Sequence, residues 1–212
     1  MNNTLIFASE KEVRFGKLLK FIIPTYLTSL FNTVYTIIDG IFVSAYVGTN
    51  ALVAINIVYP IVNVLFGIAL AFAAEAGVYG SFWLPHPQSY DGGGKKDAAN
   101  RAFSASVIAS MLVGGLVALG VLLNLSGILT LLGATPLTMR DCKIYALWWL
   151  WGTPLMIGKE LFPYFIRVDG SPTYSFATAL SGGVLNIVMD YVLVGRMQMG
   201  IRGAALATIM DD

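Results

Sequence analysis

The chain has 212 residues, of which 57% are hydrophobic and 12% charged, and its mean hydropathy is +0.73. Soluble domains usually carry about 25% charged residues, so this composition argues against a soluble single domain. The net charge of +1, with no basic run that interleaves with aromatic residues, also argues against nucleic acid as a partner.

Long uncharged stretches divide the sequence into predicted membrane-spanning helices. A helix needs about 20 predominantly apolar residues to cross the hydrocarbon core of a bilayer. The sequence therefore predicts an all-α integral membrane protein, a polytopic helical bundle that forms a single membrane domain over residues 1–212. Complete spans are expected at about 17–46, 52–79, 102–125, 144–164 and 174–194, with an incomplete sixth from about 203 and a cytoplasmic loop at 84–97.

Positively charged residues gather in the N-terminal segment and in the loops that follow the second and fourth predicted spans. Cytoplasmic loops of membrane proteins carry the excess of Lys and Arg. The positions concerned are Lys11, Arg14, Lys17, Lys20, Lys95, Lys96, Arg101, Lys159 and Arg167. The pattern predicts a multi-pass protein of the cell membrane that has lipid as a partner, a cytoplasmic N-terminus and an uncleaved first span.

Two carboxylates lie inside the predicted spans. Asp39 stands between two long uncharged stretches and Asp190 follows another. A carboxylate at membrane depth is costly and usually faces a bundle interior or a water-filled cavity. Asn186 lies one helical turn before Asp190 and on the same face, which suits either Na⁺ coordination or a proton shared through water. The alternative is that hydrogen bonds hold each acid neutral and that the acids serve packing.

Other residues of the spans have simpler interpretations. Pro24, in the same helix as Asp39, is expected to act as a hinge or to fix a bend, because an interior proline removes a backbone hydrogen bond. Lys159 and Glu160 are adjacent and cannot share a helical face, so snorkelling or separate neutralisation is expected without a role in a site. The tryptophans at 148, 149 and 151 predict an interfacial belt, with a substrate-stacking wall as the alternative.

The sequence does not predict an enzyme or a cofactor. No nucleophile, base and acid form a catalytic constellation. His86 stands between two prolines without a second metal ligand nearby. Residues 92–96 read Gly-Gly-Gly-Lys-Lys, which lacks the spacing, the hydroxyl residue and the preceding strand of a phosphate-binding loop.

An ordered series of short motifs resembles the N-terminal half of a multidrug and toxic compound extrusion (MATE) transporter. The series covers most of residues 15–209. It consists of Ile23-Pro24, Asp39-Gly40-Ile41-Phe42-Val43, residues 94–103, Tyr145, Phe165-Ile166-Arg167, Asp169-Gly170, Pro172, residues 186–190, Met199-Gly200-Ile201 and residues 203–208. The order of these pieces is far more specific than any one of them.

The resemblance implies a function and a site. Members of this family have two six-helix lobes and expel drugs or organic cations in exchange for H⁺ or Na⁺. By resemblance, Asp39, Asn186, Asp190 and Thr208 match the cation-coupling site of the N-terminal lobe and a possible Na⁺ site. Tyr145 lies near that site in the family, and Pro24 lies at the bend of the first helix. Thr208 and Tyr145 rest on the resemblance alone.

The sequence departs from the family pattern in two places. Residues 79–91 replace the expected small residues and glycine-rich loop, and a compensated pair of frameshifts is our hypothesis for this segment. The chain also stops inside the sixth span, so we expect a truncated half-transporter of doubtful activity alone, which needs a second lobe or self-association.

Two alternative functions are also compatible with the sequence. One is a lipid-linked precursor flippase of the same superfamily, whose cavity would be lined with cationic residues. The other is a non-transporting membrane remnant that binds only a partner, which predicts no dependence on Na⁺ or H⁺. The sequence does not distinguish Na⁺ from H⁺, because these oxygen ligands suit both a hard cation and a titrating carboxylate.

Overall fold

The computed structural model describes residues 15–83, 94–168 and 171–210, and these residues form helices joined by short turns. The elements are α1 (Phe15–Phe42), η2 (Val43–Val47), α2 (Thr49–Trp83), α3 (Gly94–Leu123), α4 (Leu125–Leu131), α5 (Met139–Val168), α6 (Pro172–Met189), η3 (Asp190–Arg196) and α7 (Ile201–Met210). Here η denotes a π-helix. The predicted all-α class of fold is confirmed.

Four stretches of helix have the length and hydropathy needed to cross a bilayer. They are Ile22–Val47, Thr49–Glu75, Phe103–Leu123 and Thr173–Arg196. The fourth predicted span falls in α5, which has 30 residues but is less apolar, because it carries charged residues and three tryptophans. Helix α3 starts at Gly94, before the predicted start of its span, because its first turns are polar and extend beyond the apolar stretch.

Two predictions fall largely outside the described residues. The cytoplasmic loop was expected at 84–97, and the divergent segment at 79–91 carries the frameshift hypothesis. Of these residues, only those at 79–83 and 94–97 are described, as helix backbone.

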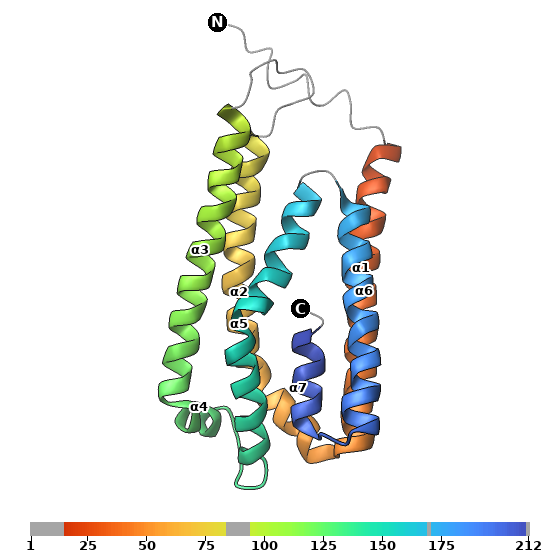
Figure 1. Ribbon diagram of the computed structural model, residues 1–212, viewed down its shortest axis with the longest axis vertical. Helices are drawn as coiled ribbons and strands as arrows, with labels where there is room; N and C mark the ends of the chain where they lie inside the picture. The colour runs from red at the N-terminus through yellow and green to blue at the C-terminus, as the bar shows by residue number, and fades with distance from the viewer. Residues whose placement is uncertain (1–14, 84–93, 169–170, 211–212) are drawn as a thin grey trace, which may run out of the picture.

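The helices form two groups (Figure 1). Helix α1 packs against α6, and α2 packs against both α3 and α5. Helix α7 lies between the groups, where it contacts α5, α6 and η3. Consecutive long helices run in opposite directions, since each is joined to the next at one end of the bundle. Residues from the first and last thirds of the sequence thereby become neighbours.

The core is built from a stripe of α2 and its partners on α5. The buried residues of α2 recur at intervals of three or four, and they are Ala51, Ala54, Ile55, Val58, Ile61, Val62, Leu65, Ala69 and Ala73. This spacing places them on one helical face. The thiol of Cys142 on α5 lies against it, with Sγ 3.8 Å from the carbonyl oxygen of Ala54.

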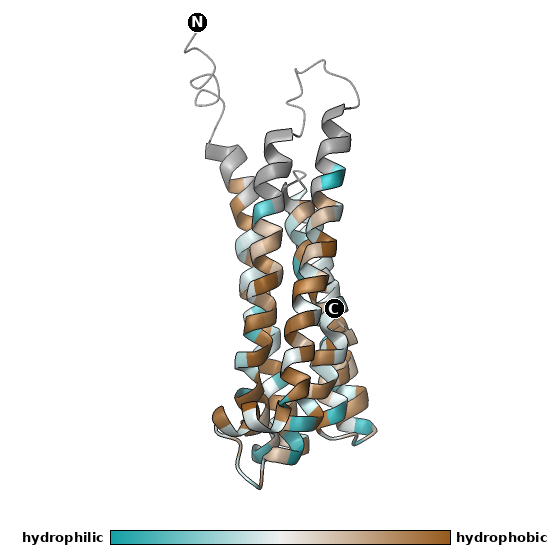
Figure 2. Cartoon of the chain, turned by 90° about the vertical axis from the view of Figure 1, so that its left-hand side faces the viewer, coloured by the Kyte–Doolittle hydropathy of each residue, from teal (hydrophilic) through white to brown (hydrophobic). Residues whose placement is uncertain are grey.

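Apolar side chains also cover the outside of the bundle. Figure 2 shows brown, apolar ribbon along most of the length of the helices and teal, polar ribbon mainly toward the ends. Large apolar residues of α1 such as Ile23, Leu30 and Ile37 are exposed. An apolar exterior is expected for a helix bundle that faces lipid tails.

Close approach between α1 and α6 depends on a glycine. A Cβ atom added at Gly183 of α6 would overlap Phe31 Cε1 and would lie 2.9 Å from Tyr35 Cδ1. Small residues at helix interfaces let backbones approach closely in membrane proteins. Gly183 therefore brings the aromatic side chains of α1 against the backbone of α6.

Candidate cation site

Asp39 is buried on the inner face of α1. Its side chain is 7% exposed, although α1 otherwise presents a row of exposed apolar residues. Thr28 and Tyr35 lie on the same side of the helix, eleven and four residues earlier, and are buried or partly buried. The sequence places these polar groups at intervals of seven and four residues, so α1 carries a polar stripe that faces the bundle.

Asn186 and Asp190 lie on α6 and at the start of η3, one turn apart. Both side chains are completely buried. Among the described residues, neither Oδ1 nor Nδ2 of Asn186 has a hydrogen-bond partner. A buried amide without partners costs about 1–3 kcal/mol relative to one that is satisfied. The carbonyl oxygen of Asn186 is therefore available to a ligand, and oxygen is the donor that hard cations such as Na⁺ prefer.

Both acids lie where an α-helix changes to a π-helix. Asp39 comes four residues before η2, and Asp190 is the first residue of η3. π-helical turns are rare and are found frequently at functional sites. The i→i+5 pattern widens the turn and alters which carbonyl oxygens are bonded. No residue type in the sequence marks these two segments, so the sequence analysis did not predict them.

Tyr145 connects α5 with α7 and with Asp39. It is 1% exposed, and its hydroxyl lies beside Thr208 and the indole of Trp149. Thr208 Oγ1 donates to the carbonyl oxygen of Ala204 at 3.0 Å. Tyr145 also interacts electrostatically with Asp39 and Tyr59. The structure thus gathers Asp39, Tyr145 and Thr208 from three helices around one polar centre.

Tyr59 of α2 is a further member that the sequence analysis missed. It interacts electrostatically with both Asp39 and Tyr35. The available signal was a tyrosine inside an apolar span, since a buried tyrosine hydroxyl usually finds a polar partner. Helix α6, which carries Asn186 and Asp190, packs against α1 and α7, so the predicted residues lie on adjoining elements.

Trp149 differs from the predicted interfacial belt. It is 3% exposed and packs edge-on against Phe66 at 5.8 Å and beside Tyr145 at 6.3 Å between ring centroids. Trp148 and Trp151 are exposed, as a belt requires. Trp149 points away from Trp148 and Trp151 because successive residues of a helix differ by about 100°.

Pro24 lies inside α1, and the helix continues through it from Phe15 to Phe42. Thr28 Oγ1 donates to the carbonyl oxygen of Pro24 at 2.9 Å. Such a bond from a threonine to the carbonyl four residues earlier often accompanies a bend in a helix. The hinge stays a prediction.

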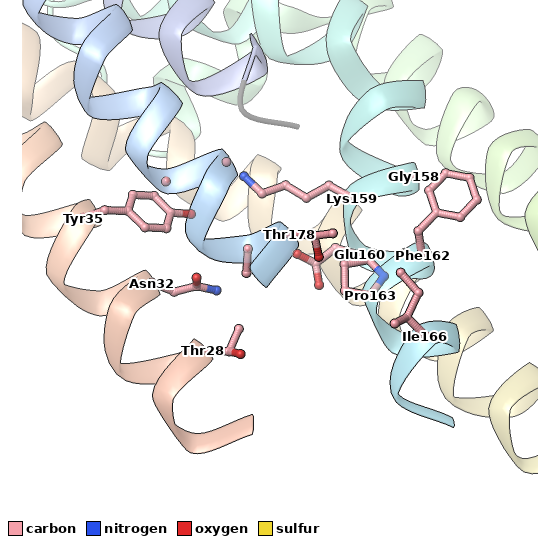
Figure 3. A pocket seen from close by; sticks show the side chains of 13 residues that line it. Thr28, Asn32, Tyr35, Gly158, Lys159, Glu160, Phe162, Pro163, Ile166 and Thr178 are labelled. Carbon is pink, nitrogen blue, oxygen red and sulfur yellow. The ribbon is translucent and has the colours of Figure 1, made fainter. Parts of the chain in front are cut away.

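A cavity of about 230 Å³ opens between α1, α5 and α6. Its polar lining comes from Thr28, Asn32, Tyr35, Lys159, Glu160 and Thr178. Figure 3 shows the Lys159 side chain reaching from α5 toward Tyr35, and its Nζ lies 5.9 Å from the centre of the Tyr35 ring. The sequence analysis gave Lys159 and Glu160 no role in a site, yet both line this cavity.

The arrangement suits a cation held by oxygen ligands rather than a transition-metal centre. Within the described ranges, no group of three His, Cys, Asp or Glu residues forms a metal cluster. The groups that interact with Asp39 are instead the phenols of Tyr59 and Tyr145, and the Thr208 hydroxyl lies beside Tyr145. The buried amide of Asn186 lies on the adjoining helix α6. Carboxylate, hydroxyl and amide oxygens are ligands for hard cations, and a buried carboxylate can also take up a proton.

Acids buried between membrane-spanning helices are rare and usually functional. A family model described as MatE matches residues 24–192. The match covers most of the chain, and the chain belongs to the MatE family. The resemblance stated from the sequence is thereby confirmed.

Known proteins support the same assignment. The multidrug export protein MepA of Staphylococcus saprophyticus is 27% identical over 214 residues, which cover 100% of this chain and 46% of that protein. A crystal structure of MATE in complex with MaD3S has a TM-score of 0.78 at 21% identity. An outward-facing multidrug resistance MATE family transporter of the MOP superfamily has a TM-score of 0.75 at 22% identity.

These alignments also show how much of each relative is shared. Both structural matches cover 92% of this chain and 42% of the solved chain. The chain therefore spans about half the length of the curated and solved relatives that it matches. At these identities the solved structures support the fold.

Proposed function

We propose that the chain is the N-terminal lobe of a cation-coupled antiporter that exports drugs or organic cations. The observation that carries this proposal is the buried centre at Asp39, where Tyr59, Tyr145 and Thr208 meet, with Asn186 and Asp190 on the adjoining helix. Intramembrane acids that face a bundle interior mark ion pathways and proton relays. The coupling ion is H⁺ or Na⁺.

The proposed mechanism couples charge to helix packing. Without a cation, the carboxylates of Asp39 and Asp190 are two negative charges in a low-dielectric interior, which favours access of water. A bound Na⁺ or proton neutralises them and favours closer packing of α1 on α6. The π-helices beside both acids are the segments whose backbone we expect to adjust, and Pro24 is the proposed hinge.

Export also needs a partner for this lobe. Alternating access moves one structural repeat against another around a central site. We propose a second lobe, or a second copy of this chain, in that role. We also propose that the protein resides in the cell membrane with a cytoplasmic N-terminus, because Lys and Arg gather on that side.

The curated relatives support export over the flippase alternative. The staphylococcal relatives carry the name multidrug export protein. The residues that interact electrostatically with Asp39 are neutral tyrosines, and Lys159 is a single cationic residue that lines the neighbouring cavity. A cavity for anionic lipid-linked precursors would require several cationic residues. No catalytic activity is part of this proposal.

Replacing Asp39 tests the proposal. The chain is expressed in a drug-sensitive, pump-deficient host, alone and together with a second lobe, and the minimum inhibitory concentration of an organic cation such as ethidium is measured. We expect resistance with the second lobe, and Asp39→Asn should abolish it, because asparagine keeps the shape but neither ionises nor takes up a proton.

Asp141→Asn is the matched control. Asp141 lies in the first turn of α5 and undergoes the same chemical change outside the site. Equal loss of resistance in both variants would show a general effect on folding. Resistance that survives Asp39→Asn, at unchanged expression, would contradict the proposed coupling site.

A further inference from the structure

Lys159 holds a positive charge inside the bundle. Its side chain leaves α5, crosses the cavity and brings Nζ to 5.9 Å from the centre of the Tyr35 ring on α1 (Figure 3). A cation over an aromatic face is attracted by the ring quadrupole, and the attraction is larger when both groups are desolvated. A lysine in a membrane span usually snorkels to the surface. The ammonium of Lys159 points inward instead.

The inward position places this ammonium over a ring on the face of α1 that also carries Asp39. Tyr35 lies one helical turn before Asp39 on the same face of α1. Tyr59 interacts electrostatically with both of these residues. Lys159, Tyr35, Tyr59 and Asp39 therefore form a continuous series of polar groups across α5, α1 and α2.

The α6 side of the cavity also lies close to a residue of the candidate cation site. Gly182 and Gly183 line the cavity, one turn before Asn186. Asn186 is fully buried, and its two polar atoms have no hydrogen-bond partner among the described residues. The unpartnered amide is an independent indication that a ligand binds at the end of the cavity nearest Asn186.

The other titratable groups near this series of polar groups are few within the described part of the chain. Glu160 lines the cavity beside Lys159, and Asp190 follows Asn186 by one turn. Tyr145 interacts electrostatically with Asp39. Helices α3 and α7 pack against α5, and their arginines, Arg101 and Arg202, are exposed. In η3, Arg196 is exposed and lies over the Tyr191 ring, at 5.8 Å from its centre.

We propose that Lys159 is a tethered cation that competes with the coupling cation for the acidic centre at Asp39 and Asp190. It is a positioning residue, and this inference rests on the proposed function. While its ammonium faces the centre, the site binds Na⁺ or H⁺ more weakly and releases it more readily. Lys159 thereby sets the cation concentration at which α1, α5 and α6 change their packing.

The expected size of the effect follows from electrostatics. Two unit charges about 10 Å apart, in a medium of effective dielectric constant about 20, change an equilibrium constant by roughly tenfold. Removal of the Lys159 charge should therefore lower the half-saturating Na⁺ concentration about tenfold. If the cation is H⁺, the midpoint should move about one pH unit higher, because a site without the nearby positive charge takes up its proton more readily.

The experiment measures cation binding to the purified full chain in lipid nanodiscs. Tryptophan fluorescence and the thermal unfolding midpoint are followed while NaCl replaces KCl at constant ionic strength, and separately while the pH is changed. The variants are Lys159→Met, the neutral Lys159→Gln and the charge-retaining Lys159→Arg. Lys143→Met removes a lysine elsewhere on α5, and Asp39→Asn removes the titrating acid.

We expect both neutral variants to shift the midpoint about tenfold toward tighter binding, while Lys159→Arg and Lys143→Met stay within about twofold of wild type. An unshifted midpoint in a folded neutral variant would overturn the inference and leave the proposed function intact. An equal shift in Lys159→Arg would overturn it too, because the charge is retained there. A wild-type chain without any cation response that depends on Asp39 would overturn the inference together with the proposed function.

Discussion

At the scale of single residues, the site combines two kinds of buried polar group. Asp39 and Asp190 are expensive because they ionise, whereas Asn186 is neutral and costly because its amide lacks hydrogen bonds. Such groups persist in a native structure when they have a use that packing does not supply. Replacing the amide should therefore raise the stability of the protein while removing cation binding.

We expect Asn186→Leu to stabilise the cation-free protein and to remove its response to cations. Leucine has a similar size and leaves no polar atom unsatisfied, so the gain should be about 1–3 kcal/mol. Loss of the carbonyl oxygen should remove the rise in unfolding temperature on cation addition. Thermal unfolding in nanodiscs, with and without cation, measures both effects.

Asn56→Leu provides the matched comparison. Asn56 is an exposed residue of α2 whose Nδ2 donates to the carbonyl oxygen of Leu52 at 2.9 Å. We expect this variant to keep the cation response. A cation response that persists in Asn186→Leu would remove Asn186 from the site.

Tyr145→Phe tests the contact between α5 and α7. The change removes the hydroxyl beside Thr208 and leaves the ring packed on Trp149. Loss of one buried hydrogen bond should cost about 0.5–1.5 kcal/mol and should weaken cation binding by several-fold. Isothermal titration with the cation gives the affinity. An unchanged affinity would mean that Tyr145 supports packing only.

At the scale of elements, the contact between α1 and α6 determines where the polar stripe of α1 lies. Gly183 permits this contact because Phe31 and Tyr35 occupy the volume of a Cβ atom. The centre of the Tyr35 ring lies 5.9 Å from the ammonium of Lys159, and Tyr35 lies one helical turn from Asp39. The position of one aromatic ring therefore connects helix packing with the site.

Gly183→Ala is expected to destabilise the protein by about 1–3 kcal/mol, because the added methyl group overpacks the interface of α1 and α6. Gly115→Ala on α3 is the control, since nothing lies within 4 Å of its added Cβ atom. Alanine is favoured over glycine inside a helix by about 1 kcal/mol, so this control should be neutral or slightly stabilising. Denaturation in mixed detergent micelles compares the two. Equal stabilities would contradict the close contact.

The sequence predicted the helices well and their packing less well. Uncharged stretches locate the helices because the bilayer demands length and apolarity. They do not show which face of α2 is buried, because its lipid-facing residues are as apolar as Val58 or Leu65. Asp39, Asn186 and Asp190 stood out because polar groups are rare in such helices. The inward direction of Lys159 and the two π-helices depend on tertiary packing and left no mark in the sequence, whereas Tyr59 was visible only as a tyrosine inside an apolar span.

At the scale of the whole molecule, the bundle combines buried polar residues with an apolar exterior. The drug export that we propose additionally requires a counterpart that moves relative to this lobe. Binding and exchange should therefore separate experimentally. The chain alone should bind the coupling cation, whereas exchange should depend on a second lobe or a second copy.

Liposomes that contain on average less than one chain per vesicle test this separation. We expect the cation-dependent fluorescence change to remain and the uptake of tetraphenylphosphonium driven by a pH or Na⁺ gradient to be absent. At high chain density, uptake that rises with the square of density would indicate self-association. Gradient-driven uptake at the lowest density would contradict the requirement for a partner.

The contact between Cys142 and the carbonyl oxygen of Ala54 has a practical consequence for spectroscopy. Cys142 is the only cysteine of the chain, and it is buried where α5 meets α2. A maleimide dye can react with it only when these helices separate, because a buried thiol is shielded from reagents. Dyes or spin labels can therefore be attached to cysteines introduced on α1 or α6 in the natural background. Slow labelling of the unaltered chain would time the separation of the core helices.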